Sequence, residues 1–239
     1  MLFESIARSQ SPPVRWGLGA FAMVQVVFWL ASASSVLLYA GGRSVAVWEL
    51  AFAVAMPGVI SAALVGLITI RRGNGPRTDL KLYWSWRNVA LGLVFGVGGL
   101  VISVPAAFVY VWVVGSDAST AVGDVFGGVR TSLPIAVIVF LVVVLVAPLC
   151  EEVVYRGMLW GALERRWGRW AALVVSTIVF ALAHLEFTRF PLLLVVAIPI
   201  GLARLYSGGL LASIVAHQVT NVLPGIVLAL GLIGALPVT

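Results

Sequence analysis

The chain has 239 residues, of which 62% are hydrophobic and only 10% are charged, and its formal net charge is +6. This composition is far from that of soluble globular proteins, and apolar segments of about twenty residues recur along the whole length. It excludes a soluble enzyme or binding module. It predicts an all-α, polytopic membrane protein in which residues 1–239 form a single membrane-embedded domain.

Eight apolar segments are predicted to be transmembrane helices. The first is expected to be retained, because its apolar sequence continues past a stretch that resembles a signal-peptidase site. Gly92 and Gly96 have the small-xxx-small spacing that favours close packing between helices. The predicted helices cover about residues 16–40, 47–70, 88–114, 133–163, 170–187 and 190–206, a seventh that starts near Leu210, and an eighth over about 224–237.

The basic residues are divided unequally between the two sides that these helices define. With the N-terminus in the cytoplasm, eleven basic residues lie on inner segments and three on outer loops. This bias follows the positive-inside rule, so it predicts a multi-pass plasma-membrane protein that contacts membrane lipid and no nucleic acid. The inner set is Arg8, Arg15, Arg71, Arg72, Arg77, Lys81, Arg87, Arg165, Arg166, Arg169 and Arg204, and the outer set is Arg43, Arg130 and Arg189.

The stretch LCEEVVYRG, residues 149–157, places three charges directly after an uncharged apolar run. Charged groups inside a bilayer are costly, so they are functional candidates by default. Glu152 and Arg156 are four residues apart, share a helix face and are predicted to form a structural ion pair. Glu151 points about 100° away, so its partner is expected on another helix.

Both histidines of the chain, His184 and His217, also lie in apolar segments. At about 1.5 Å of rise per residue, Glu151 lies about 18 Å, and His184 about 21 Å, from the inner ends of their helices. His217 and Asn221 lie roughly 10–18 Å along theirs and share one face, as do Phe180 and His184. Three predicted helices therefore bring a carboxylate, two imidazoles and an amide to a similar depth.

These groups suit the hydrolysis of an amide bond inside the membrane. A buried carboxylate can act as a general base toward water, and an imidazole can hold that water or bind a metal. A side-chain amide and a second imidazole can stabilise a tetrahedral oxyanion. The sequence therefore predicts an intramembrane endopeptidase with four catalytic candidates, Glu151, His184, His217 and Asn221, and with Phe180 as a supporting residue.

Three short motifs follow one another on successive predicted helices: EEVVYR fits E-E-x-x-x-R, FALAH fits F-x-x-x-H, and HQVTN fits H-x-x-x-N. This ordered trio, within about 150–222, resembles the CAAX prenyl protease type II family, also called the CPBP intramembrane protease family. The first three helices match that family only in being hydrophobic. Family members are eight-helix membrane proteases, some of which remove a C-terminal tripeptide after a prenylated cysteine.

The resemblance implies roles for individual residues. Glu151 would activate water with His184, and His217 with Asn221 would form the oxyanion site. The substrate would be a membrane-associated peptide or a lipidated protein, with CAAX-type processing as one candidate reaction. Many relatives are described as metalloproteases, although H-E-x-x-H is absent from this sequence. A divalent metal such as zinc, held by Glu151, His184 and His217, therefore stays open beside a glutamate-activated water alone.

Two other functions are compatible with the same residues. A non-proteolytic membrane protein, such as a bacteriocin-immunity or regulatory partner, would use the fold as a scaffold, although intact motifs favour catalysis. A proton-coupled transporter would use Glu151 and the histidines as a relay. Discontinuous helices in two inverted halves would support transport, and the sequence shows no such halves.

Overall fold

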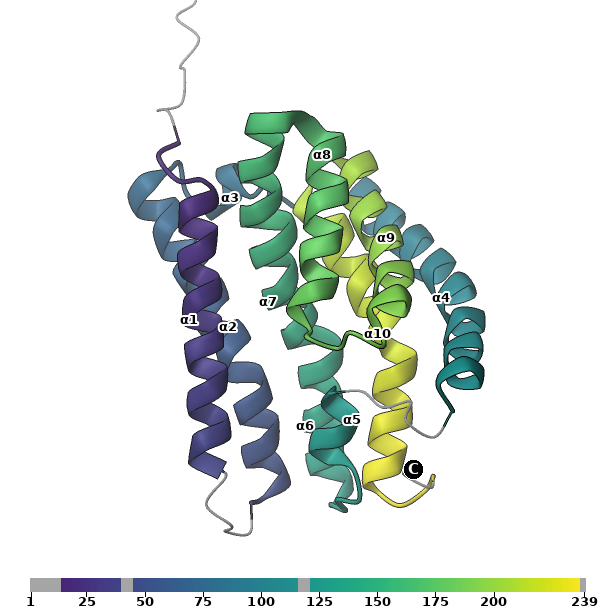
Figure 1. The fold of residues 1–239 in the computed structure, drawn as a ribbon. Helices are drawn as coiled ribbons and strands as arrows, with labels where there is room; N and C mark the ends of the chain where they lie inside the picture. Colours follow the sequence, from purple (N-terminus) through teal and green to yellow (C-terminus); the bar gives the residue numbers. More distant parts are fainter. Residues whose placement is uncertain (1–13, 40–44, 116–120, 237–239) are drawn as a thin grey trace, which may run out of the picture.

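Helices make up all the regular structure in the residues that the computed structural model describes, which are 14–39, 45–115 and 121–236. The long helices run side by side, and the short helices α3 and α5 lie at opposite ends of the bundle (Figure 1). The all-α membrane fold predicted from the sequence is confirmed. In chain order the elements are α1 (Leu18–Tyr39), α2 (Val47–Arg72), α3 (Pro76–Asp79), α4 (Trp86–Val114), α5 (Ala121–Phe126), α6 (Leu133–Leu141), the π-helix η2 (Val142–Val146), α7 (Ala147–Glu152), the π-helix η3 (Val153–Leu159), α8 (Trp160–Ala183), α9 (Phe190–Ser207) and α10 (Leu210–Leu232).

The number of membrane-spanning helices is smaller than the eight predicted. Within the described ranges, six helical runs are long and apolar enough to cross a membrane. One of them, Leu133–Ala183, is 51 residues long and bends at Gly168, whose φ is 81° and whose ψ is 171°. Glycine adopts this positive φ without steric cost. The run therefore rises through α6, α7 and the start of α8 and descends through the rest of α8 (Figure 1).

The predicted seventh and eighth helices form a single helix, α10, which contains Pro224 in its interior. Proline is tolerated inside membrane helices because neighbouring groups can satisfy the freed backbone carbonyl. With the bent run counted as two crossings, the described residues make seven crossings. The end of α10 therefore lies at the opposite end of the bundle from the start of α1 (Figure 1).

The segment that carries the two adjacent glutamates has an irregular helical backbone on both sides. η2 precedes α7 and η3 follows it, so the glutamates lie between two π-helical segments. Pro148 is in the first turn of α7, and a proline ring clashes with the carbonyl four residues earlier, here Val144 inside η2. Such local widening of a helix is frequent at functional sites.

Close contact with α4 holds α10 in place. A Cβ atom added at Gly96 would lie 2.7 Å from Cβ of Val219 and 3.0 Å from the carbonyl oxygen of Ala216, both on α10. Gly92, one turn earlier on α4, meets α10 at a similarly short distance. The close helix packing predicted from the spacing of these glycines is confirmed, and it involves the helix that carries the last sequence motif.

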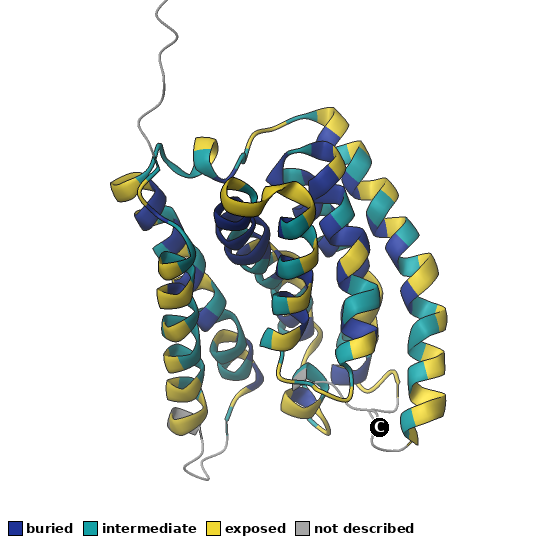
Figure 2. Ribbon diagram, turned by 45° about the horizontal axis from the view of Figure 1, so that its top comes forward, coloured by how far each residue is buried: buried dark blue, intermediate teal, exposed yellow. Residues whose placement is uncertain are grey.

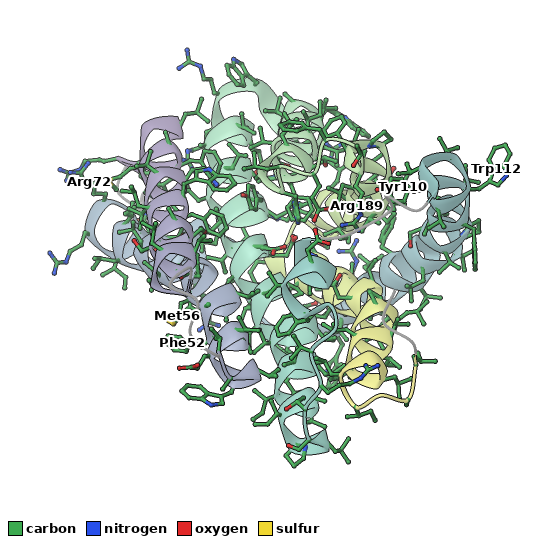
Figure 3. The ribbon with its side chains drawn as sticks, turned by 60° about the horizontal axis from the view of Figure 1, so that its bottom comes forward. Phe52, Met56, Arg72, Tyr110, Trp112 and Arg189 are labelled. Carbon is green, nitrogen blue, oxygen red and sulfur yellow. The ribbon has the colours of Figure 1, made fainter. Side chains whose placement is uncertain are left out.

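Burial separates the bundle into an interior and an apolar surface. The outward faces of α1 and α4 are exposed and apolar (Figure 2), as at Leu37 and Trp112, and Trp112 points away from the bundle (Figure 3). A broad exposed apolar surface of this kind is expected of helices that face lipid. The residues around η3 are buried, and they include the charged side chains of Glu152 and Arg156.

Most of the described arginines lie at the end of the bundle that carries α3 and the bend in α8 (Figure 1). Arg204 is the exception among the residues predicted for that side, because its side chain is buried within the bundle and is only 2% exposed. Arg8 and Arg43 lie outside the described residues. The charge bias at this end is therefore carried by exposed side chains on the segment before α1 and on α2, α3, α4 and α8.

Candidate active site

The two adjacent glutamates have different surroundings. The side chain of Glu152 is 0% exposed, whereas that of Glu151 is 31% exposed. Nη1 of Arg156 donates a hydrogen bond of 3.1 Å to Oε1 of Glu152, within the same helical run. The Arg156 guanidinium also lies 4.3 Å from the centre of the Phe180 ring and donates to the carbonyl of Ala197. Glu152 and Arg156 therefore form a fully buried pair.

His217 on α10 contacts both glutamates. Its Nδ1 lies 3.0 Å from Oε1 of Glu152, and its Nε2 lies 3.7 Å from Oε2 of Glu151. Because a buried carboxylate accepts from Nδ1, this contact assigns the Nδ1 proton and directs Nε2 toward Glu151. The partner of Glu151 thus lies on another helix. A single imidazole joins the partly exposed carboxylate to the buried ion pair.

His184 lies at the end of α8, next to Phe180. Its Nδ1 donates a 2.8 Å hydrogen bond to the carbonyl oxygen of Phe180, which leaves Nε2 as the available nitrogen. The Phe180 ring centre is 4.7 Å from that of His184 and 5.6 Å from that of His217. Within the described part of the chain, no ion pair joins His184 to either glutamate. Phe180 therefore contacts both imidazoles.

Asn221 lies one turn beyond His217 on α10. Its Nδ2 donates a 3.1 Å hydrogen bond to the carbonyl oxygen of Val143, inside η2. This contact joins α10 to the irregular segment before the glutamates. The second N–H of the amide is not used in that bond, so Asn221 keeps a donor for another group.

Arg204 on α9 belongs to the same buried network, although the sequence places it among the surface cations. Its Nε donates a 3.1 Å hydrogen bond to the backbone carbonyl of Arg156, and its guanidinium lies 5.5 Å from the Trp160 ring centre. Nothing in its spacing from the motifs indicates this contact, which forms between residues 48 positions apart. Arg204 therefore supports the η3 backbone from a neighbouring helix.

The residues considered as metal ligands do not gather into a metal site. In residues 14–39, 45–115 and 121–236, no group of three or more His, Cys, Asp or Glu side chains is arranged to hold an ion. The set of Glu151, His184 and His217 therefore does not fit zinc in this arrangement.

Comparison with known proteins agrees with the order of the motifs. Residues 133–223 match the family model described as type II CAAX prenyl endopeptidase Rce1-like. An uncharacterized 24.3 kDa protein of Escherichia coli is 24% identical over 210 residues, which cover 86% of this chain and 86% of that protein. No solved structure matches the chain.

The matched segment begins with α6 and extends into α10, so it contains the two glutamates, both histidines and Asn221. Residues 133–223 are therefore similar to an Rce1-like domain, and the match leaves helices α1 to α5 outside it.

Proposed function

We propose that this protein is an intramembrane endopeptidase that cleaves a membrane-associated protein or peptide with a water molecule activated by Glu151. The observation that carries the proposal is the position of His217, with Glu152 at 3.0 Å from one ring nitrogen and Glu151 at 3.7 Å from the other. Glu151 is the base in this proposal, because its side chain is 31% exposed while that of Glu152 is enclosed.

The proposed reaction needs one proton acceptor and one proton donor, and Glu151 can serve as both. It takes a proton from water as the water oxygen attacks the carbonyl carbon of the substrate amide, and it later gives that proton to the departing amine. His184 holds the attacking water through its available Nε2. Contacts of this kind are often long without substrate and tighten when the substrate binds, so the separation of His184 from Glu151 is compatible with this role.

The oxyanion formed in this step requires hydrogen-bond donors. In the proposal His217 supplies Nε2–H and Asn221 supplies its second amide N–H from the next turn of α10. The contact of Nδ1 with Oε1 of Glu152 orients the ring so that Nε2 faces Glu151, which supports the donor role of His217.

The class of substrate and the orientation of the protein in the membrane are also part of the proposal. The family match supports a substrate at the membrane, and a lipidated protein with a CAAX-type C-terminus is the candidate that its description suggests. The exposed arginines around α3 support a cytoplasmic location for that end of the bundle, since basic residues concentrate on the inner side of plasma membranes.

Replacement of Glu151 tests the proposal directly. Glu151→Gln keeps the size of the side chain and removes the base, so we expect the cleavage rate to fall by at least about 10²-fold. His217→Ala should also abolish turnover, and adding it to Glu151→Gln should cause little further loss, because the two residues act as a unit. The measurement is the appearance of cleaved fragments in membranes of cells that express each variant.

Glu164→Gln is the matched control, because Glu164 is a partly exposed carboxylate paired with Lys81 at 3.0 Å and lies outside the site. This variant should cleave like the wild type. Normal cleavage by Glu151→Gln would contradict the role of Glu151 as the base. The absence of cleaved fragments with the wild type would favour the non-proteolytic use of the same fold.

A further inference from the structure

Two cavities open at the arginine-rich end of the bundle, away from the proposed active site. One has a volume of about 510 Å³ and lies between the start of α1 and the end of α2. The other, of about 450 Å³, lies between the start of α1 and the bend in α8. Both are lined by Trp16, Gly17 and Gly19, so the start of α1 separates them.

The lining of the cavity between α1 and α2 changes from charged to apolar along the two helices. Its mouth carries Arg15, Arg71 and Arg72, and the backbone N–H of Arg15 donates a 2.8 Å hydrogen bond to the carbonyl of Arg72. Further along the two helices the lining becomes apolar, with Met23 on α1 and Leu67 on α2. Met23 follows Leu18, the first residue of α1, by five residues, which corresponds to about 7.5 Å of helix rise. The charged mouth therefore continues into an apolar stretch of the lining, where Met23 and Leu67 are each 48% exposed.

The arginines of this cavity are available to an anion. All three are exposed, and no acidic side chain of the described residues lines the cavity. None of the ion pairs found in the described ranges includes Arg15, Arg71 or Arg72. Figure 3 shows Arg72 beside α1 at the edge of the bundle, where lipid would surround it.

The wall shared by the two cavities is held in place from both sides. Trp16 is 5% exposed, and its indole N–H donates a 2.9 Å hydrogen bond to Asp79 of α3. Arg165 donates to the backbone carbonyl of Trp16 and stacks 4.0 Å from the centre of its ring. Arg165 is therefore engaged in the protein, which makes the cavity between α1 and α2 the better anion site.

We propose that the cavity between α1 and α2 binds an anionic glycerophospholipid. Its phosphate would lie among Arg15, Arg71 and Arg72, and one acyl chain would follow the apolar lining at Met23 and Leu67. Basic pockets between membrane helices on the cytoplasmic side attract such headgroups, and guanidinium groups pair well with phosphate oxygens. A volume of about 510 Å³ is of the size of ordinary ligand pockets. The proposal does not depend on catalysis by Glu151.

The test uses the full chain in nanodiscs that contain phosphatidylcholine with increasing fractions of phosphatidylglycerol. Native mass spectrometry counts the retained lipid, and thermal unfolding reports stabilisation. The wild type should retain phosphatidylglycerol and unfold at higher temperature as its fraction rises. Arg71→Gln with Arg72→Gln should weaken the apparent affinity by roughly 10- to 30-fold, as expected when two charges near a phosphate are removed.

The matched control is Arg77→Gln with Arg169→Gln, which removes two exposed charges from the same end without touching the cavity. This variant should retain phosphatidylglycerol like the wild type. An equal loss in both double variants would overturn the proposal in favour of general surface attraction. Equal stabilisation by soluble glycerol phosphate would also overturn it, because the site would then bind free phosphate rather than lipid.

Discussion

Glu151 and Glu152 have the same side chain but different environments, and His217 contacts both of them. Its Nδ1 contacts the fully buried Glu152, and its Nε2 faces the partly exposed Glu151. The spacing within EEVVYR is enough to predict that Glu152 and Arg156 are neighbours and that Glu151 faces elsewhere. The contact between His217 and Glu152 could not be predicted in this way, since it joins residues 65 positions apart through the packing of two helices.

The buried pair should be important for stability. Removing one partner leaves a buried charge uncompensated, which costs about 3–5 kcal/mol. We therefore expect Arg156→Gln and Glu152→Gln each to lower the unfolding temperature in detergent. The double variant should recover part of the loss, because no charge of the pair then remains, although His217 still lacks its carboxylate partner. A double-mutant cycle of unfolding temperatures measures the coupling.

Glu151→Gln belongs in the same experiment as a comparison, since its side chain is not enclosed. It should leave the unfolding temperature unchanged or slightly raised while it removes activity. Additive losses for the variants at Glu152 and Arg156 would show that the two side chains are not energetically coupled. Glu152 would then have to be considered as the base in place of Glu151.

At the scale of helices, local sequence patterns predicted contacts better than they predicted boundaries. The spacing of Gly92 and Gly96 correctly indicated close packing, because small residues are required wherever two backbones approach. Pro224 indicated a break that does not occur, because a proline within a packed bundle need not end a helix. The π-helical segments η2 and η3 have no apolar period of their own, so the hydrophobic pattern could not reveal them.

Arg204 shows why a charge near a helix end cannot be assigned to the surface from sequence alone. It lies in the last turn of α9, where an arginine commonly reaches the membrane interface. Its side chain is instead enclosed and donates to the carbonyl of Arg156 in η3. Two arginines from different helices thus support the segment next to the glutamates.

The contact between α4 and α10 gives a prediction with a close control. At Gly96 a new methyl group would lie 2.7 Å from Val219 and 3.0 Å from a backbone oxygen, so the helices must separate. Gly96→Ala should therefore destabilise the protein by about 1–3 kcal/mol, as overpacking does in other cores. It should also lower activity, because α10 carries His217 and Asn221. The unfolding temperature and cleavage rate are the measurements.

Gly98→Ala is the control, since a Cβ atom there meets nothing within 4 Å and the residue lies on the same helix. Replacing glycine inside a helix by alanine is otherwise favourable by roughly 0.5–1 kcal/mol. The control should unfold at the same temperature as the wild type or above it. If both variants behaved alike, the proximity of α4 and α10 would not limit stability.

For the whole molecule, composition and hydropathy were sufficient to predict a helical membrane bundle, because the cost of unpaired backbone groups in lipid leaves few alternatives. The same patterns predicted where the chain enters and leaves most apolar segments. They did not give the number of crossings, because that number depends on whether residues 210–237 turn back at Pro224. Turning is decided by packing against neighbouring helices, which hydropathy does not record.

The number of crossings determines the side of the membrane on which α10 ends. With the arginine-rich end in the cytoplasm, seven crossings place the end of α10 outside, whereas eight would return it to the cytoplasm. Alkaline phosphatase is active only outside the cytoplasm, so a fusion of it after Leu236 should be active. A green fluorescent protein fused at the same position should be dark, because it does not become fluorescent when it is exported unfolded. Fusions after Arg77 should behave in the opposite way, and fusions after Gly128 should behave like those after Leu236. Reversal at all three positions would keep seven crossings and invert the orientation. Reversal after Leu236 alone would restore the eighth helix and refute the continuous α10.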